Sequence, residues 1–385
     1  MGSRVPLAIF CFFAIFNVNA VYSYPSSASS NAEKNSTLQL VHMLMRHGPR
    51  TPVNTYPNDP YLNNTFYPYG WGQLTNNAKA ELYKLGNWLR MRYKNELGPY
   101  FFNDLLYAQA TVSGRTHMTL ATLLAAMFPP KNSAMEWNTK LNWQPIPIYS
   151  LPEKDDIWLR MRVPCPRYDQ AFQEALQLPE VAAEHAESQS LFDELSEITG
   201  TNITTAADVN SVFITLQAEE AYGLKLPPWT KRYYPEKLTF MAEQTYVYNA
   251  YTPELRKLKG GPFVQKMFNE WQSKARGELV PKDRKFFMYG AHDWTLTNVL
   301  ATMNVWKRAF PRFSAMALFE LHKDLDTEEY YVEIYYKYDP NKPVKRLTVP
   351  GCEFQCPLKK LIKLTKAVLP DGTYEEMCEP KNTST

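Results

Sequence analysis

The chain has 385 residues, of which 45% are hydrophobic and 21% are charged, and its formal net charge is +3. This composition is ordinary for a globular protein with one elaborated domain or two. The balance of 42 basic and 39 acidic residues does not favour a nucleic-acid partner, because such proteins usually gather basic residues on one face.

The N-terminus has the pattern of a secretory signal. Arg4 precedes an apolar run over 5–16, and small residues suitable for cleavage follow at 18–20. The run is too short to span a bilayer, and no later apolar stretch is long enough. We therefore expect residues 1–20 to be a signal peptide and the mature protein to be secreted or to enter the lysosomal lumen, without a membrane partner. Sequons for N-glycosylation begin at Asn35, Asn63, Asn202 and Asn382.

Four cysteines remain after removal of the signal, an even number for an oxidising compartment. Cys352 and Cys356 are spaced for a short-loop disulfide, although in a cytosolic protein the same spacing could hold a metal. The remaining pair would join Cys165 to Cys378.

The segments before and after residues 151–237 alternate between expected strands and helices. The strands are expected at 38–45, 107–112, 285–290, 315–322 and 330–338, and the helices at 75–93, 116–127, 240–251, 261–274 and 294–302. Only 323–329 separates the last two strands, so they should be antiparallel. The lysines in 359–364 fall on the solvated side of an amphipathic helix.

Between these parts, the chain predicts helices without strands, at 169–178, 181–199 and 206–222. We therefore expect an α/β fold with a mainly parallel sheet flanked by helices and a smaller inserted helical domain. Residues 35–150 and 238–378 would form the discontinuous α/β domain, and residues 151–237 the helical cap. Aromatic residues of this block, including Trp158, Tyr168 and Trp229, could line the mouth of a cleft or belong to the core.

Two polar segments follow buried strands, where open α/β sheets carry their sites. Arg46-His47-Gly48-Pro49-Arg50 follows the first strand, and His292-Asp293 follows the strand at 285–290. Arg115 lies where another strand gives way to a helix. Arginines and a helix N-terminus match phosphate oxygens, and a histidine among them can form a covalent phosphoryl intermediate. The pattern indicates phosphoryl transfer in which arginines neutralise the phosphate charge.

A metal site is not expected from the histidines. His42 and His47 are five residues apart on or next to one strand and should face opposite ways. His117, His185 and His322 have no neighbouring ligand motif and are interpreted as surface or structural residues. We expect no cofactor.

Arg46-His47-Gly48-x-Arg50-x-Pro52 together with the distant His292-Asp293 closely resembles the histidine acid phosphatases, in the branch with prostatic, lysosomal and insect venom enzymes. The resemblance extends from about Leu38 to Cys378 and includes the segments 142–147 and 350–357. It implies the histidine phosphatase fold and a secreted acid phosphatase. Small phosphomonoesters or phosphopeptides would be its substrates.

The resemblance also implies roles for individual residues. His47 would be the nucleophile and Asp293 the proton donor, while Arg46, Arg50, Arg115 and His292 would bind the phosphate. Relatives often carry Asp before the third arginine, where this chain has Gly114. A homodimer is a further implication. The alternatives are a narrower phytase or lysophospholipid phosphatase of the same superfamily, and a secreted binding protein without activity.

Overall fold

The computed structural model describes residues 36–381, which contain a seven-stranded mixed sheet. The strand order is β2-β3-β1-β4-β5-β6, and β7 pairs with β5. The parallel part consists of β1 (Ser36–Arg46), β2 (Leu106–Ala110) and β3 (Phe286–Ala291). Antiparallel pairing adds β4 (Met316–Asp324), β5 (Tyr330–Lys337), β6 (Lys345–Leu347) and β7 (Cys356–Pro357). The antiparallel pairing expected for the last two long strands is confirmed.

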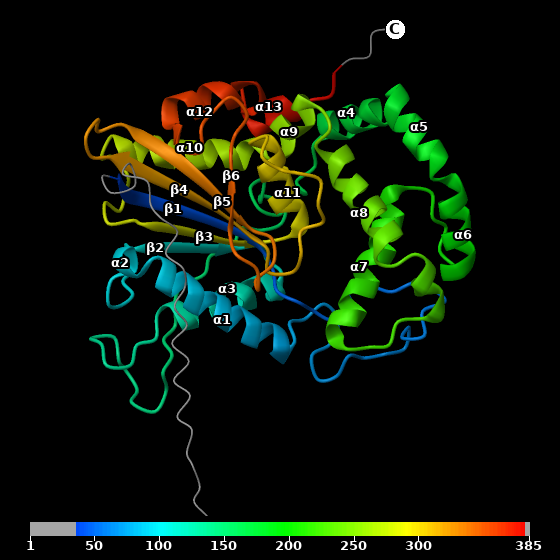
Figure 1. Cartoon of the computed structure of the whole chain (residues 1–385), viewed down its shortest axis with the longest axis horizontal. Coiled ribbons are helices and arrows are strands. Elements are labelled where there is room, and N and C mark those ends of the chain that lie inside the picture. The colour runs from blue at the N-terminus through cyan, green and yellow to red at the C-terminus, as the bar shows by residue number, and fades with distance from the viewer. Residues whose placement is uncertain (1–35, 382–385) are drawn as a thin grey trace, which may run out of the picture.

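Helices cover both faces of the sheet, as Figure 1 shows. One face packs against α1 (Asn76–Arg92) and α3 (Gly114–Met127), with α2 (Lys94–Leu97) beside them. The other face packs against α10 (Gly261–Ala275), α11 (Asp293–Thr302) and α12 (Leu358–Thr365). The α/β fold class expected from the sequence is confirmed, but the sheet is mixed: β1, β2 and β3 pair in parallel, and the other strand pairs are antiparallel.

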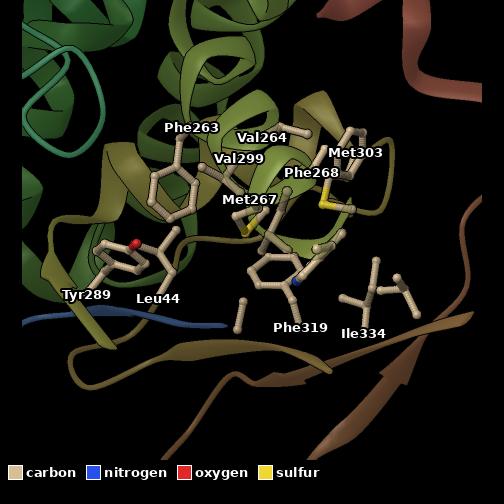
Figure 2. Packing of buried hydrophobic residues seen from close by; sticks show 14 of the residues in the cluster. Leu44, Phe263, Val264, Met267, Phe268, Tyr289, Val299, Met303, Phe319 and Ile334 are labelled. Atoms are coloured by element: carbon tan, nitrogen blue, oxygen red, sulfur yellow. The ribbon is translucent and has the colours of Figure 1, made fainter. Parts of the chain in front are cut away.

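β1 lies in the middle of these layers and is apolar on both sides. Val41, Met43 and Met45 face α1 and α3, whereas Leu40 and Leu44 face α10 and α11. Figure 2 shows Leu44 and Phe319 of the sheet meeting Phe263 and Met267 of α10. Burying each such side chain stabilises the fold by roughly 1.5–3 kcal/mol. The end of β1 is therefore held at a fixed position.

Gly290 allows β3 to run close to α3. A Cβ at this position would lie 2.9 Å from the carbonyl oxygen of Thr116 and 2.8 Å from a side-chain carbon of Leu120. A larger residue would push the helix away from the strand. The close approach brings the N-terminus of α3, where Arg115 lies, next to the end of β3.

The helical block lies to one side of the sheet (Figure 1). It contains α4 (Pro166–Leu176), α5 (Pro179–Glu187), α6 (Gln189–Thr199) and α7 (Ala206–Tyr222). The next helix, α8 (Glu236–Asn249), packs on α7 and shares a hydrophobic cluster with it that is distinct from the two clusters at the sheet. Residues 151–249 contain no strand.

Some helices differ from the sequence-based expectation. The single helix expected at 181–199 is two helices that meet at Ser188, whose hydroxyl donates to the carbonyl of Glu184 and so competes with the helical pattern. The short helices α2, α9 (Pro253–Lys259) and α13 (Tyr374–Cys378) were not expected. Each has seven residues or fewer, too short for a recognisable period.

The structure contains both disulfides that the sequence predicted, Cys165–Cys378 and Cys352–Cys356. Asn63 and Asn202 are exposed, whereas Asn35, Asn382 and the expected signal at 1–20 lie outside the described residues. Within 36–381, no helix combines the length and apolar character needed to cross a membrane.

Candidate active site

The two polar segments meet because β1 and β3 are neighbours. Arg46 is in register with Ala291, and the amide of His47 donates to the carbonyl of Ala291 at 3.0 Å. Both strands are parallel and end at the same edge of the sheet, where α/β folds place their ligands. Residues 46–50 and 290–293 are thereby brought to one place.

Arg46 is fully buried and fixes the carboxylate of Asp293. Its Nη2 lies 3.1 Å from Asp293 Oδ2, and its Nη1 donates to the carbonyl of Pro311 at 2.6 Å. The guanidinium carbon stacks 4.1 Å from the centre of the Phe313 ring. A buried arginine with these contacts has a single orientation, so the positive charge of Arg46 is fixed directly behind Asp293.

The imidazole of His47 has a defined tautomer. Its Nδ1 lies 2.9 Å from the carbonyl oxygen of Gly48, and a carbonyl can only accept, so Nδ1 carries the proton. In the neutral ring Nε2 then has the lone pair, and nothing among the described residues bonds to it. Burial lowers the pKa of His47 well below its ordinary value, and the charges of Arg115 and Arg46 lower it further.

His292 stands next to His47, with the ring centres 5.6 Å apart. Its Nε2 lies 3.0 Å from the hydroxyl of Thr111 and 3.5 Å from Nη1 of Arg160. Burial, and then the charge of Arg115, holds the pKa of His292 well below its ordinary value. The lowered pKa favours the neutral ring, which is held by Thr111, directly after β2, and by Arg160 from the loop before α4.

Asp293 is the first residue of α11 and uses both carboxylate oxygens. Oδ1 accepts the amide proton of Trp294 at 2.8 Å, and Oδ2 pairs with Arg46. Tyr246 of α8 is buried beside it, and burial together with the charge of Asp293 raises the pKa of the Tyr246 hydroxyl. Asp293 is thus positioned from three elements of the fold.

Arg50 and Arg115 present N–H groups without partners. The Nε atoms of both are buried and make no hydrogen bond within residues 36–381, while Nη1 of Arg50 donates to the carbonyl of Thr51. Buried donors without partners are rare in folded proteins. They are the groups that an anionic ligand would satisfy.

Gly114, the departure from the family pattern, is not forced by lack of space. A Cβ there would meet only the side-chain oxygen of Gln73, at 3.8 Å. Arg115 on the first turn of α3 thus has no carboxylate on the preceding residue, and burial, followed by the nearby charge of Arg160, lowers its pKa.

The arginines destabilise one another in the absence of an anion. Burial, and then the charges of Arg115 and Arg46, lowers the pKa of Arg50 to about 9. Burial and the charge of Arg160 lower the pKa of Arg115 to about 10. Both side chains stay cationic in acid and at neutral pH. A bound dianion would offset this repulsion.

These groups line one cavity of about 430 Å³. It contains His47, Arg50, Arg115, His292 and Asp293, so the structure brings all the expected site residues together, with Arg46 directly behind Asp293. Sequence reasoning missed several further polar residues that line it, namely Arg160, Arg162, Asn210, Lys259 and Asn298. The Arg-x-Arg spacing at 160–162 was the only local signal for any of them.

The aromatic residues named from the sequence have different positions. Tyr168 lines the cavity. Trp158 packs beside the cluster between α10 and the sheet, and Trp229 packs on Tyr56 in the helical block.

The other histidines lie apart from the cavity. His42 and His47 do not share a ligand position, because His42 bonds to Glu270 on the opposite side of β1. His322 lies between Glu320 and Glu333, where ligand-type atoms come within 4.8 Å of one another. Glu320 already accepts bonds from Arg92 and Tyr93, so this group is an ion-pair network across β4 and β5.

The sequence model of the histidine phosphatase superfamily (branch 2) matches residues 37–337. The chain belongs to this superfamily and is therefore an enzyme that hydrolyses phosphate esters. Lysosomal acid phosphatase of Homo sapiens is 32% identical over 366 residues, which cover 94% of this chain and 84% of that protein. Venom acid phosphatase Acph-1 of Apis mellifera is 35% identical over 349 residues, covering 89% and 88%.

Solved structures share the fold at low sequence identity. The phytase from Citrobacter braakii has a TM-score of 0.66 and 15% identity, covering 89% of this chain and 99% of its own. The apo form of Hafnia alvei phytase has a TM-score of 0.64 and 16% identity, covering 90% and 99%. These similarities support the fold alone.

Proposed function

We propose that this protein is a secreted or lysosomal acid phosphatase that hydrolyses phosphomonoesters through a phosphohistidine on His47. The observation that carries the proposal is the fixed tautomer of His47. Nδ1 is bonded to the carbonyl of Gly48, so the lone pair of Nε2 is available in a cavity lined by Arg50 and Arg115, with Asp293 opposite. A nucleophile, an anion site and an acid meet within one cavity.

In the first step, Nε2 of His47 attacks phosphorus and the bond from phosphorus to the ester oxygen breaks. Protonated Asp293 gives its proton to the departing alcohol. In the second step, water attacks phosphorus, the bond from phosphorus to Nε2 of His47 breaks, and Asp293 takes a proton from that water. Inorganic phosphate then leaves, and His47 is neutral again. In this proposal Arg50, Arg115 and His292 hold the phosphoryl oxygens from the cavity wall, and Arg46 contributes to phosphate binding with its charge from behind Asp293. The guanidinium groups supply the positive charge, so the proposal includes no metal or cofactor.

The proposed chemistry fits acidic conditions. Burial and the flanking arginines keep the pKa of His47 low, so its ring stays neutral and nucleophilic at a pH where a free histidine would be protonated.

We also propose export after cleavage of residues 1–20, glycosylation of the sequons and a homodimer. The sequence-based cap over 151–237 stays a proposal, and we propose that it extends through α8, because α8 shares its hydrophobic cluster with α7. A binding protein without activity is disfavoured because every expected catalytic group is present in the cavity. Phytase or lysophospholipid phosphatase activity remains an alternative that a substrate panel would test.

The test is to trap the intermediate. The enzyme is mixed with ³²P-labelled p-nitrophenyl phosphate, quenched within milliseconds, and digested. We expect an acid-labile, alkali-stable label on the peptide that contains His47, and none in His47→Ala. A label on serine or aspartate would overturn the mechanism.

Asp293→Asn separates nucleophile from acid in the same experiment. Nitrophenolate leaves without a proton, so this variant should still label His47 from p-nitrophenyl phosphate. An alkoxide needs the proton, and acid catalysis contributes about 10²–10⁴-fold, so labelling from an alkyl phosphate should be slowed by that factor. Equal slowing with both substrates would contradict the assignment of Asp293 as the acid.

A further inference from the structure

One wall of the cavity is a tight loop before α4. The amide of Met161 donates to the carbonyl of Asp156 at 3.0 Å, and the carboxylate of Asp156 accepts the amide of Leu159 at 2.8 Å. Thr295 of α11 donates to the carbonyl of Leu159 at 2.6 Å. Met161 has a φ of 53°, a left-handed conformation that is costly for a residue with a side chain. Strain of this kind persists only where the surroundings fix the backbone, and it collects at ligand sites.

The strained residue separates two arginines that line the cavity. Nη1 of Arg160 lies 3.5 Å from Nε2 of His292, which places Arg160 at the edge of the phosphate pocket, and its Nε pairs with Glu153 at 2.7 Å. Arg162 also lines the cavity and has no carboxylate partner within residues 36–381. The loop therefore presents one guanidinium that is in an ion pair and one that is not.

Lys259 faces the same loop from the end of α9. Its Nζ donates to the carbonyl of Met161 at 3.0 Å and lies 4.0 Å from the centre of the Tyr168 ring. No carboxylate in the described chain pairs with it, although Lys257, two residues earlier, pairs with Asp371. An ammonium has three donors, and the carbonyl of Met161 is its one hydrogen-bond acceptor in the described chain, so Lys259 can also donate to a ligand. Burial lowers the pKa of Lys259 to about 8, which leaves it cationic in acid.

The cavity carries more positive charge than one phosphate needs. A single carboxylate, Asp293, lines it, and that carboxylate is already paired with Arg46. Five cationic side chains line it, namely Arg50, Arg115, Arg160, Arg162 and Lys259. A phosphate dianion held by Arg50 and Arg115 leaves Arg162 and Lys259, neither of which forms an ion pair with a carboxylate of the described residues, able to bind a second anion.

We propose that Arg162 and Lys259 form a second anion subsite, and that the enzyme prefers phosphomonoesters whose leaving group carries another anionic group. This inference rests on the proposed function and deepens it. The second group would be a phosphate or a carboxylate, since either oxyanion accepts from an ammonium and a guanidinium.

The experiment compares three substrates whose leaving groups share a three-carbon chain and differ in the group at its far end. Propyl phosphate has one anionic group, 3-phosphooxypropanoate adds a carboxylate, and propane-1,3-diyl bisphosphate adds a phosphate. Release of inorganic phosphate at constant acidic pH and ionic strength gives kcat/KM for each. The parent enzyme should prefer at least one of the two-anion substrates by about tenfold to hundredfold, the range for charge-assisted hydrogen bonds in a partly buried site. Which of them is preferred identifies the second group.

Lys259→Gln and Arg162→Gln should each reduce this preference severalfold or more. The matched control is Lys257→Gln, on the same helix but outside the cavity, which should keep the parental preference. Arg162 is exposed, so its variant tests the subsite even if Lys259→Gln folds poorly. Equal kcat/KM for all three substrates in the parent, or a preference that neither variant lowers, would overturn the subsite and leave the phosphatase proposal intact. Absence of turnover of every monoester would instead overturn the proposed function.

Discussion

At the scale of single residues, Arg115 has two effects on His47. It is proposed to hold the phosphate, and after burial its charge is the largest influence that lowers the pKa of the imidazole. The same charge that binds substrate therefore keeps the nucleophile unprotonated in acid. Binding and activation are linked through one side chain.

Arg115→Gln should move the acid limb of the kcat/KM profile to higher pH. Without the arginine, the pKa of His47 rises toward its ordinary value, so the ring becomes protonated at a higher pH and loses its lone pair. Activity at the optimum should fall by about 10²–10³-fold, as for loss of a transition-state donor. The profile is measured with p-nitrophenyl phosphate, and kcat/KM reports the free enzyme.

Arg276→Gln serves as the control, because Arg276 pairs with Glu278 on the surface. Its profile should match that of the parent. An acid limb that stays in place in Arg115→Gln would show that the charge of Arg115 does not act on His47.

Local sequence identified the site residues that follow strands and missed those that approach through tertiary packing. His47 and His292 each directly follow a strand, so their meeting could be expected from the rule for open sheets. Arg160 reaches His292 across 132 residues of chain, and Tyr246 approaches Asp293 from the middle of α8. No local pattern encodes such contacts, since they depend on how the helical block packs on the sheet.

At the scale of elements, the long periodic segments were predictable and the short ones were not. The expected helix over 75–93 corresponds to α1, with Thr75 accepting the amide of Ala78 as its cap. The helices α2, α9 and α13 span at most seven residues. Lys259 is the last residue of α9 and lines the cavity. Because the sequence did not predict α9, it did not predict this part of the cavity wall.

A buried carboxyl group of α7, that of Glu219, lies next to Asp59 in the segment that follows residues 46–50. Both carboxyl oxygens of Glu219 are buried without a hydrogen-bond donor, and Asp59 lies beside them. Burial, and then Asp59, raises the pKa of Glu219 to about 9. The folded protein therefore keeps this proton at a pH where the unfolded chain has released it, since a free glutamate titrates near 4.5.

Stability should consequently fall as the pH rises between about 4.5 and 9, because over this window the folded state binds one more proton than the unfolded state. Glu219→Gln removes this dependence. The variant should gain melting temperature relative to the parent at pH 7.5 and gain less at pH 5, with about 2–4 °C for each kcal/mol. Differential scanning calorimetry at both values is the measurement.

Glu220→Gln, next on the same helix and exposed, is the matched control and should show no such difference. A gain of equal size at both pH values would mean that Glu219 acts by packing alone.

At the scale of the whole molecule, the sheet and the helices on its two faces hold mutually repelling cations together in a buried place. Three arginines lie at one end of the parallel strands, and burial with their mutual repulsion lowers the pKa of Arg50 to about 9. Such a site costs stability in the empty enzyme and gives it back when an anion binds. Natural enzymes commonly lose stability at functional sites in this way.

Inorganic phosphate should therefore raise the melting temperature of the parent, with a gain in stability of about 2.7 kcal/mol at one hundred times its Kd.

Arg50→Gln should melt higher than the parent without phosphate, because the replacement removes a buried charge repelled by Arg46 and Arg115. It should also lose most of the phosphate-dependent gain. His47→Ala should keep much of that gain, because the arginines rather than the neutral imidazole hold the anion. Scanning calorimetry at pH 5 across phosphate concentrations, with chloride keeping the ionic strength constant, measures all three proteins. A lower melting temperature for empty Arg50→Gln, or an undiminished response to phosphate, would show that Arg50 supports the fold and not the anion site.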